Sequence, residues 1–519
     1  MLKSDYHTEP TEMDTMIFKK LVAEDHYLRR VKATINFARM RELVAECYSP
    51  TMGRPGEDPV LMLKLCFLQF QYDLSDRDVI REAQVNIAYR FFLDLSLESA
   101  LPVASLLVQF RARLGEKRFR EVFDEILRQA REQGLVKDRL RLKDATHVIA
   151  CVAIPATIRL VAQTRERVLK AARRLAPEEV AAQQQRAEQV RETTRELKDQ
   201  QRLLARVEHL REIVAWADEW QERLRAAVAA GAGRIEQREL REFEAALELA
   251  HKVLNDREPK TPDRLCSLVD PEVRTGQHGA FFDGYSLDVS VDADSEMICA
   301  LDVLAANADE AANAKTLIES EEQTHGNDIE MISMDGIGFR GDILRKLQAE
   351  EGPQVEVFVP TWEWPGCEPG LFKPDDFQLN ETSDELTCPG RQKTRSRTRA
   401  NRNRGWQFHF RAAQCANCPL RAQCLKPETQ KGRTVIKSDY EAEYAAARQK
   451  AQTDKFKEIR KEHPRVERKL GEMIRWHGGR RVRYRGRLRV KIQYFLIGFV
   501  VNIKRFVKLF CPSPLPQFT

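Results

Sequence analysis

The hydrophobic pattern of the first quarter of the chain predicts helices. Residues 59–70 are almost continuously apolar and begin with a proline, which is tolerated in the first turn of a helix because its missing N–H is not needed there. Ser75 is suited to cap a helix over 76–84, and two further helices are predicted over 87–95 and 103–114. Short helices joined by tight turns are typical of helix-turn-helix modules and also of other helical bundles. We therefore expect an all-helical segment, with DNA contact as one of two open interpretations.

A second helical pattern covers about 158–254, where apolar residues repeat at spacings of three and four. Two stripes carry this repeat: Leu203, Val207, Leu210, Val214, Ala217, Leu224 and Val228, then Leu240, Phe243, Leu247, Ala250 and Leu254. A Gly-Ala-Gly turn at 231–233 separates them. The pattern predicts an antiparallel helical hairpin with a coiled-coil seam. It is either an arm or dimer contact, or a structural insertion that buries its own seam.

Strand patterns lie on both sides of this helical region. Residues 140–153 alternate and then become apolar, which predicts a strand that enters a sheet interior. Residues 284–292 and 297–304 predict a hairpin. A helix is expected over 309–320, and a short buried strand is expected over 329–335. Strands that alternate with helices indicate a mixed α/β sheet.

The last third of the chain is irregular at first and then helical. Residues 350–440 are rich in Pro, Gly and basic groups, 439–474 read as helical, and an apolar helix is predicted over 490–509. The longest apolar run, 494–503, is half of the roughly 20 residues that a membrane span needs. The amino-terminal residues also have no apolar export signal. We therefore expect a soluble intracellular protein with no membrane partner.

Composition places the chain among ordinary globular proteins. Hydrophobic residues make up 42% of the 519 residues and aromatic residues 8%, which argues against wholesale disorder. At roughly 150 residues per domain, the length suggests about three units.

The net charge of +6 conceals two basic segments. Beyond Glu472 there is no acid but there are eleven cations, so the preceding residues carry a net charge of −5: Arg475, Arg480, Arg481, Arg483, Arg485, Arg487, Arg489, Lys491, Lys504, Arg505 and Lys508. Residues 391–404 carry seven cations and no acid. Clustered cations suit a polyphosphate partner such as nucleic acid, because neutralised phosphates release counterions. A solvated tail that only aids solubility is the alternative.

Two acids lie in or at the end of apolar strands, where a carboxylate is costly unless it is paired. Two explanations are open for the carboxylates of Asp144 and Asp335 in these strands. Each could form a salt bridge with an arginine, or both could bind one divalent cation, since Mg²⁺ takes oxygen ligands. A third acid is then expected from the helix before the basic tail. Glu462, Glu467 and Glu472 cannot share one helical face at these spacings, and periodicity does not choose among them.

Four of the eleven cysteines are clustered. Cys388, Cys415, Cys418 and Cys424 supply thiolates for a tetrahedral Zn²⁺ site, and two of them have CxxC spacing. Cys367 or His409 could replace one ligand, and reduced cysteines without metal are the alternative. The remaining cysteines read as small buried residues: Cys47, Cys66, Cys151, Cys266, Cys299 and Cys511.

Residues 24–95 resemble the helical amino-terminal domain of bacterial insertion-sequence DDE transposases. The resemblance continues in the segments 143–150, 270–294, 333–342 and 464–505. It implies a ribonuclease H-like catalytic domain with one Asp on the first strand, another after the fourth strand and a Glu on a later helix. By their motifs, the acids of this family correspond to Asp144 in Lys-Asp-Ala-Thr-His, Asp335 in Met-Asp-Gly-Ile-Gly-Phe and Glu467 in Arg-Val-Glu-Arg.

The resemblance also implies the activity and the partners. The expected protein is a DNA transposase that binds the ends of its insertion sequence and catalyses cleavage and strand transfer with two Mg²⁺ (or Mn²⁺) ions. Its partners would be double-stranded inverted-repeat ends, target DNA and a second copy of itself, with no small-molecule substrate. It would work in the bacterial cytoplasm at the nucleoid. The alternatives are a decayed, non-catalytic DNA-binding copy and a Mg²⁺ nuclease without a joining step.

The expected fold is an α/β ribonuclease H-like core with a helical amino-terminal domain and an inserted antiparallel helical hairpin. The predicted divisions are a helical DNA-binding domain at 1–135, the core at 136–157 and 258–350, the coiled-coil insertion at 158–257, a basic cysteine-containing insertion at 351–438, and the Glu helix with the basic carboxy-terminal helix at 439–519.

Several basic residues are candidates for DNA contact: Arg111, Arg113, Arg391, Arg395, Arg397, Arg465, Arg468, Lys469, Arg481, Arg483 and Arg485. For the residues that flank Glu467, pairing with Glu462 or Glu472 along the helix is an equal alternative. His147 is expected to orient a neighbour, and the tryptophans Trp362, Trp364 and Trp406 to pack in the core or loops more than to stack on unpaired bases. Asp292 and Asp294 are expected in a hairpin turn.

Overall fold

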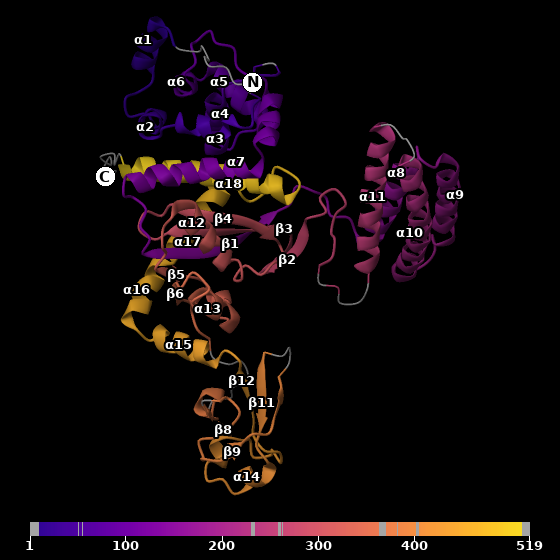
Figure 1. Cartoon of the computed structure of the whole chain (residues 1–519), viewed down its shortest axis with the longest axis vertical. Helices are drawn as coiled ribbons and strands as arrows, with labels where there is room; N and C mark the ends of the chain where they lie inside the picture. The colour runs from indigo at the N-terminus through magenta and orange to yellow at the C-terminus, as the bar shows by residue number, and fades with distance from the viewer. Residues whose placement is uncertain are drawn as a thin grey trace.

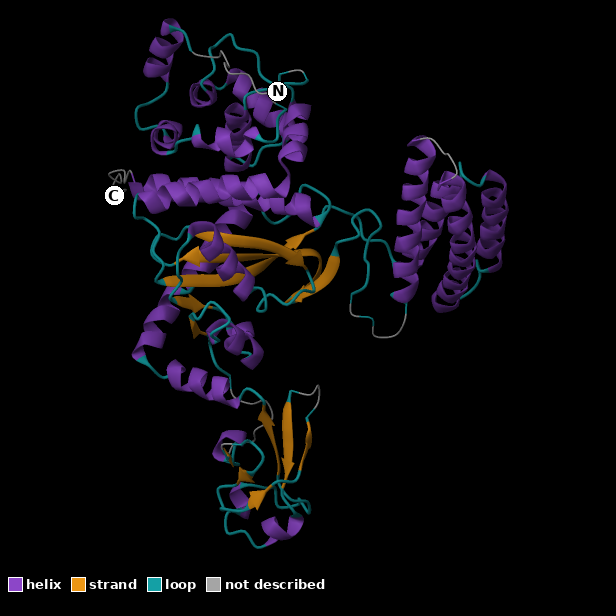
Figure 2. Cartoon of the chain, viewed as in Figure 1, coloured by secondary structure: helices purple, strands orange, loops and turns teal. Residues whose placement is uncertain are grey.

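The described residues form a six-stranded mixed sheet near the middle of the molecule (Figures 1 and 2). The computed structural model describes residues 10–49, 51–53, 55–229, 234–257, 261, 263–362, 370–380, 382–400 and 404–510. The strands are β1 (Leu140–Ile149), β2 (Arg274–His278), β3 (Ala280–Asp292), β4 (Ile298–Ala305), β5 (Met331–Ser333) and β6 (Glu356–Phe358). β3 pairs antiparallel with β1, β2 and β4, whereas β5 runs parallel to both β1 and β6. The predicted mixed sheet is confirmed, and β2 and β6 are additions to the predicted strands.

The two faces of this sheet differ in polarity. One face is apolar and packs against helices, with Leu142, Val148, Tyr285, Leu287, Val289 and Val291. The other face holds paired charges: Arg141, fully buried, contacts Asp292 at 2.9 Å and Glu321 at 2.6 Å. Lys143 contacts Asp288 at 3.0 Å. Charges buried in this way are tolerated because each has an opposite partner.

Helices precede the sheet, as predicted. They are α1 (Glu12–Leu21), α2 (Tyr27–Thr34), α3 (Arg39–Ala45), α4 (Pro59–Gln71), α5 (Asp76–Val85), α6 (Ile87–Leu93) and α7 (Ala104–Glu132). Ser75 caps α5 by accepting the N–H of Asp78 at 3.1 Å. At Gly115 the backbone of α7 has φ of +66°, a conformation that favours glycine, so helical geometry is interrupted one residue beyond the predicted end.

The helix α18 (Arg487–Phe510) joins the amino-terminal helices to the sheet. It packs against α2, α4, α7 and β4, and Figure 1 shows it beside α7. A Cβ at Gly498 would lie 2.9 Å from both Leu301 of β4 and Phe123 of α7, so glycine permits this close approach. The Phe67 and Phe499 rings lie 6.3 Å apart in the same core. The predicted amino-terminal unit therefore shares one hydrophobic core with the sheet.

A second group of helices covers the opposite end of the sheet. α12 (Ala314–His325), α13 (Gly341–Gln348) and α15 (Glu441–Ala451) pack with β5 and β6 around a separate core. The chain then continues through α16 (Asp454–Glu462) and α17 (Pro464–Trp476), where a continuous helical region was expected. α12 begins five residues later than predicted, because residues 309–313 form turns.

The helical insertion differs from the predicted hairpin. It consists of α8 (Thr157–Ala172), α9 (Pro177–Thr193), α10 (Asp199–Ala229) and α11 (Arg234–Asn255), and it lies to one side of the sheet (Figure 1). α10 and α11 do pack together, but both also pack on α8, and α9 covers α8 and α10. The apolar stripes therefore face a shared multi-helix core instead of a two-helix seam. Val228 and the Gly-Ala-Gly turn lie outside the described side chains.

Residues 370–438, which we call the cysteine module, form a small unit at the far end of the molecule from the amino-terminal helices (Figure 1). Short strands replace the expected irregular structure: β7 (Gln378–Leu379), β8 (Leu386–Thr387), β9 (Lys393–Thr394), β10 (Arg397–Arg399), β11 (Gly405–His409) and β12 (Thr434–Ser438), with the short helix α14 (Ala412–Ala416). Within the described residues, no helix is both long and apolar enough to cross a bilayer.

Candidate active site

Asp144 lies in the middle of β1, opposite Val289 of β3. Side chains alternate along a strand, so Asp144 points to the apolar face together with Leu142 and Val148. The backbone N–H of Ala145 donates to its carboxylate at 2.8 Å. Burial raises the pKa of Asp144, the negative charges of Asp335 and Glu467 add to this effect, and the result is a pKa of about 7. A carboxylate in this setting favours an added proton or cation.

Asp335 follows β5 and precedes a short 3₁₀ turn at Gly336–Gly338. β5 pairs in parallel with β1, and Leu142 is aligned with Ser333. Asp144 and Asp335 each come two residues after this aligned pair. Neighbouring strands lie about 4.8 Å apart, so the register brings the two acids to the same edge. Asp335 is half-buried.

Glu467 lies in the first turn of α17, which packs on β1 and β3. Its carboxylate is exposed and, within the described residues, has no ion-pair partner. The acids Asp144, Asp335 and Glu467, here called the acidic trio, thus come from three separate elements. Asp335 and Glu467 are each within electrostatic range of Asp144, because both of them raise its pKa.

The two other candidate glutamates are held in ion pairs. Glu462 contacts Arg139 at 3.0 Å and Arg465 at 2.9 Å. Glu472 contacts Lys469 at 3.0 Å and Lys504 at 2.6 Å. Burial raises the pKa of Glu472, but the two lysines outweigh burial and lower it to about 2. Their placement agrees with the choice of Glu467 from the family motif.

Arg460 of α16 is a residue of this site that sequence reasoning missed. Its guanidinium donates to Ser333 Oγ at 3.0 Å and to the Met334 carbonyl at 2.7 Å. Burial lowers the pKa of Arg460, and the negative charges of the acidic trio act in the opposite direction. Arg460 precedes Glu467 by seven residues, which is two helical turns, but Pro464 hides this relation in the sequence.

His463 supports the same corner of the site. It is buried, and its Nδ1 lies 3.1 Å from Ser333 Oγ. Burial lowers the pKa of His463 to about 4, so the ring is neutral near pH 7. Ser333 therefore links β5 to both Arg460 and His463.

The acidic trio offers oxygen ligands that suit a hard cation such as Mg²⁺. The negative charges of Asp335 and Glu467 raise the pKa of the half-buried Asp144, and a bound cation would relieve this repulsion. Among the described residues, however, no group of three or more His, Cys, Asp or Glu side chains is already arranged around a metal position. The donor chemistry fits the ion, while the carboxylates still have to close around it.

A groove of about 600 Å³ runs along α17 next to Glu467. Its lining is Glu467, Arg468, Gly471, Glu472, Arg475, Trp476 and Lys504. The Trp476 side chain is 69% exposed, which is unusual for so large an apolar ring. A Cβ at Gly471 would meet no atom within 4 Å, so packing does not require glycine in this helix. Trp476 and Gly471 were not among the predicted site residues; the available signal was a tryptophan nine residues after Glu467 in the same helix.

Two predicted DNA-contact residues serve the fold instead. Arg111 is only 5% exposed, donates to Asp76 at 2.5 Å and lies 5.2 Å from the Tyr484 ring. Arg483 donates to the Leu74 carbonyl at 2.6 Å and lies over the Phe70 ring at 4.7 Å. Their guanidinium groups are therefore occupied between the amino-terminal helices and the basic tail.

Most of the other basic residues predicted to contact DNA are exposed, and some of them form ion pairs. Arg113, Arg391, Arg395, Arg468, Arg481 and Arg485 are exposed. Arg465 and Lys469 pair with Glu462 and Glu472, which is the alternative considered for them. Arg395 also pairs with Glu385 at 3.1 Å.

The tryptophans and His147 occupy packing positions to different degrees. Arg397 and Arg399 lie 4.0 and 4.3 Å from the Trp406 ring. Trp362 is half exposed and makes an edge contact with Phe339, and Trp364 lies outside the described residues. The His147 ring lies 5.0 Å from Phe282.

Two further groups of predicted residues differ in outcome. Asp294 lies in the turn after β3, as expected, and pairs with Arg139, whereas Asp292 ends β3 itself and is buried.

Of the cysteines expected to be buried, Cys66 and Cys299 are buried. Cys47 and Cys266 are half-buried, and Cys151 is exposed, because it follows the last residues of β1. Cys511 and Cys367 lie outside the described residues.

Comparison with known families gives two matches, at opposite ends of the chain. Residues 16–113 match the transposase domain (DUF772), and residues 387–507 match the transposase DDE domain. The second match includes Glu467, whereas Asp144 and Asp335 lie between the two matched segments. No curated protein and no solved structure matches the chain. The two transposase matches together support a DDE transposase of insertion sequences.

Proposed function

We propose that this transposase binds the ends of its insertion sequence and catalyses Mg²⁺- or Mn²⁺-dependent DNA cleavage and strand transfer. The single observation that carries the proposal is the convergence of the acidic trio. Its members come from β1, the end of β5 and α17, and Asp335 and Glu467 both shift the pKa of Asp144. Charged groups from elements so far apart in sequence are typical of a functional site.

The topology supports a ribonuclease H-like core. The order β4–β3–β1–β5–β6 has antiparallel pairs on one side of β1 and parallel pairs on the other. Apart from the added β2, Asp144 lies on the first strand and Asp335 follows the fourth, as the family resemblance implies. In this proposal the core comprises the predicted ranges 136–157 and 258–350 and extends to β6, which pairs with β5, whereas α8–α11 and the cysteine module are insertions.

The chemistry assigned to the site is phosphoryl transfer. Bound divalent cations would polarise the scissile phosphate and activate the attacking water or 3′-hydroxyl. Asp144, Asp335 and Glu467 would hold these cations. Arg460, fixed by Ser333 and the Met334 carbonyl, would hold its positive charge beside the acids and orient the substrate phosphate.

The groove along α17 is the proposed path of the DNA strand that leaves the site. Arg468 and Arg475 are exposed and can meet phosphates, and Trp476 offers a stacking surface for a base. Exposed Arg481 and Arg485 continue the positive surface into the tail. We further propose that two copies act together on two ends, in the bacterial cytoplasm at the nucleoid, and that no small molecule is a substrate.

The test uses oligonucleotide duplexes that carry the terminal inverted repeats flanking the reading frame. Replacing Asp144, Asp335 or Glu467 with alanine should abolish cleavage and leave end binding unchanged. Asp454→Ala is the matched control, because this exposed acid on α16 pairs with Lys457 alone among the described residues. If cleavage survives all three replacements, the assignment is wrong.

Two alternatives have separate signatures. A decayed copy would bind the ends without cutting them under any divalent cation. A plain nuclease would cut but would not insert a precut 3′-hydroxyl end into plasmid DNA.

A further inference from the structure

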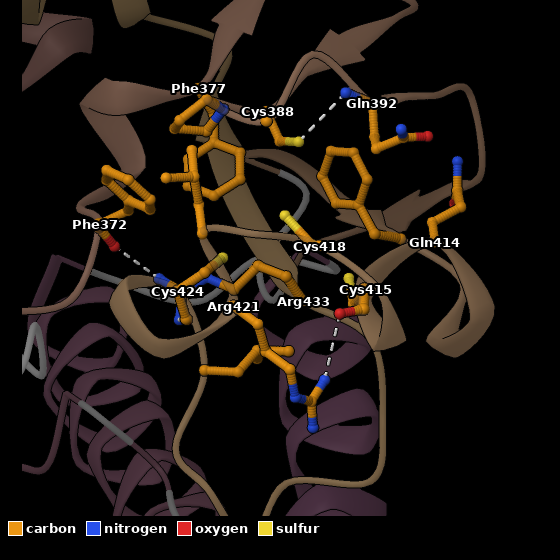
Figure 3. Close-up of a pocket in the computed structure, with 15 residues that line it drawn as sticks. Phe372, Phe377, Cys388, Gln392, Gln414, Cys415, Cys418, Arg421, Cys424 and Arg433 are labelled. Atoms are coloured by element: carbon orange, nitrogen blue, oxygen red, sulfur yellow. Dashed lines mark hydrogen bonds between the residues drawn. The ribbon is translucent and has the colours of Figure 1, made fainter.

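Four cysteine side chains surround one small cavity in the cysteine module (Figure 3). The cavity has a volume of about 20 Å³, and Cys388, Cys415, Cys418 and Cys424 all line it. A void needs roughly 10–15 Å³ to hold a water-sized particle. This cavity therefore has room for a single ion and none for an organic ligand.

A glycine keeps the space between two of the sulfurs open. A Cβ at Gly390 would lie 3.0 Å from Cys418 Sγ and 3.7 Å from Cys388 Sγ. The two cysteines are 30 positions apart in the sequence, yet their sulfurs lie beside the same glycine. A larger residue at this position would fill the gap between them.

The backbone around the cysteines is shaped to present sulfur. The N–H of Arg391 donates to the Cys388 carbonyl at 2.8 Å, which closes a tight turn, and the N–H of Gln392 donates to Cys388 Sγ at 3.3 Å. The Cys415–Cys418 segment forms a second turn, with Cys418 N–H donating to the Cys415 carbonyl at 3.4 Å. The N–H directed at Cys388 Sγ fixes the orientation of this side chain, as hydrogen bonds to metal ligands commonly do.

Two arginines supply compensating charge. Arg421 donates to the Cys415 carbonyl at 3.4 Å, and Arg433 donates to the Cys424 carbonyl at 3.2 Å; both line the cavity. A zinc ion with four thiolates has a net charge of −2, and two guanidinium groups offset it.

The module has little else to hold it together. Its hydrophobic core consists of Phe377, Leu386, Phe408, Phe410 and Val435. Units with so small a core usually need a metal or disulfides for stability. His409, the other candidate ligand among the described residues, is directed to Thr398, with Nε2 and Oγ1 3.0 Å apart.

We propose that Cys388, Cys415, Cys418 and Cys424 bind one structural zinc ion, which closes the cysteine module. The thiols are not yet gathered at bonding distance, since no group of three or more ligand side chains among the described residues is arranged around a metal. Small side-chain rotations around a cavity of ionic size would complete the site. Zinc binding would also hold the β10–β11 pair in place. The Arg397 and Arg399 guanidinium groups would thereby stay over the Trp406 ring.

The test measures zinc in the full chain, purified under reducing conditions and dialysed against a weak chelator. We expect one zinc per chain by mass spectrometry. The double replacement of Cys415 and Cys418 with serine should lower the zinc content to about a tenth or less, because a closed site cannot replace two lost ligands. Cys151→Ser removes an exposed cysteine elsewhere and should leave the zinc content unchanged.

A second comparison separates ligand loss from misfolding. Cys418→His preserves a zinc ligand and should keep the metal, whereas Cys418→Ser should lose it. Chelation with a strong chelator should make residues 370–438 sensitive to protease while the rest of the chain stays resistant.

Three results would overturn the proposal: wild-type chain without zinc after reconstitution with zinc chloride, a disulfide among the four cysteines in freshly reduced protein, or full zinc content in the double variant. None of these results depends on DNA cleavage, so the zinc site and the proposed transposase activity fail independently.

Discussion

Asp144 on β1 and Asp335 just beyond the end of the parallel strand β5 occupy equivalent positions, each two residues beyond the aligned pair Leu142–Ser333. The backbone register thus fixes two carboxylates beside each other before any cation is present. Glu467 approaches the pair from a helix and keeps an exposed side chain. The site therefore combines two acids on the sheet with one acid on a helix that is available to close around a ligand.

Replacing Asp144 with asparagine should stabilise the metal-free chain at pH 8. Its pKa is raised, first by burial, from 3.8 to about 7 in the fold. An acid with a raised folded-state pKa binds protons more tightly when folded, so its contribution to stability is lost as the pH rises from about 4 to 7. Asparagine avoids this loss, and we expect a gain of about 1–3 kcal/mol in the free energy of unfolding. Urea denaturation without divalent cations measures the free energy of unfolding of both chains. A less stable Asp144→Asn variant would contradict the raised pKa of Asp144.

The apparent affinity for Mg²⁺ should fall below pH 7. Protons compete with the cation for Asp144, and each pH unit below the pKa should weaken binding up to about tenfold. Cleavage of a terminal-repeat duplex, titrated with Mg²⁺ at pH 6, 7 and 8, gives this dependence. An affinity that does not change between pH 6 and pH 8 would argue against Asp144 as a ligand.

Arg460→Lys should lower the cleavage rate by about 10- to 100-fold, although it preserves charge. Lysine cannot reproduce the fork that contacts Ser333 Oγ and the Met334 carbonyl together. Single-turnover cleavage at saturating Mg²⁺ measures the effect, and thermal unfolding checks the fold. A rate within twofold of wild type would show that Arg460 has no positioning role.

Trp476→Ala should weaken binding to a terminal repeat with an unpaired end by about 1–3 kcal/mol, the usual contribution of one stacked base. Binding to the fully paired duplex should change less. Trp476→Phe should restore most of the affinity, because phenylalanine keeps an aromatic face. Fluorescence anisotropy with both DNA forms tests this, and equal losses on both forms would exclude base stacking.

Replacing Arg111 should affect the stability of the fold, whereas replacing Arg113 should affect DNA binding. Arg111→Gln breaks a buried pair with Asp76 and should cost about 3–5 kcal/mol of stability. Arg113 is exposed, and Arg113→Gln should change stability by less than about 0.5 kcal/mol. If Arg113 contacts a phosphate, its replacement should reduce the steepness of the plot of log binding constant against log salt concentration by about one unit. A stable Arg111 variant would be inconsistent with its buried position.

The sequence could predict the strands and helices that have strong periodicity. Helix α4, the β3–β4 hairpin and the strand that carries Asp144 follow directly from their apolar patterns. β2 and β6 are short and have few distinctive residues, so their pairing depends on neighbouring strands. α9 has a weak apolar stripe, so the apolar pattern of the insertion predicts only a two-helix hairpin.

The site was predictable only where a motif identified it. Asp144 and Asp335 stand out as charges in apolar strands, whereas Glu467 needed the family motif to distinguish it from Glu462 and Glu472. In the structure the other two glutamates are held by basic partners, and the choice of Glu467 stays a prediction. Burial of Arg111 depends on contacts between segments hundreds of residues apart, which periodicity does not reveal.

The position of α18 has a consequence for incomplete chains. Its apolar residues complete the core that α2, α4 and α7 share with β4. During synthesis at about 5–20 residues per second, the amino-terminal helices emerge long before this partner does. A product of a premature stop or frameshift would leave both apolar surfaces uncovered, so it should aggregate or be degraded before it can compete with intact copies for DNA.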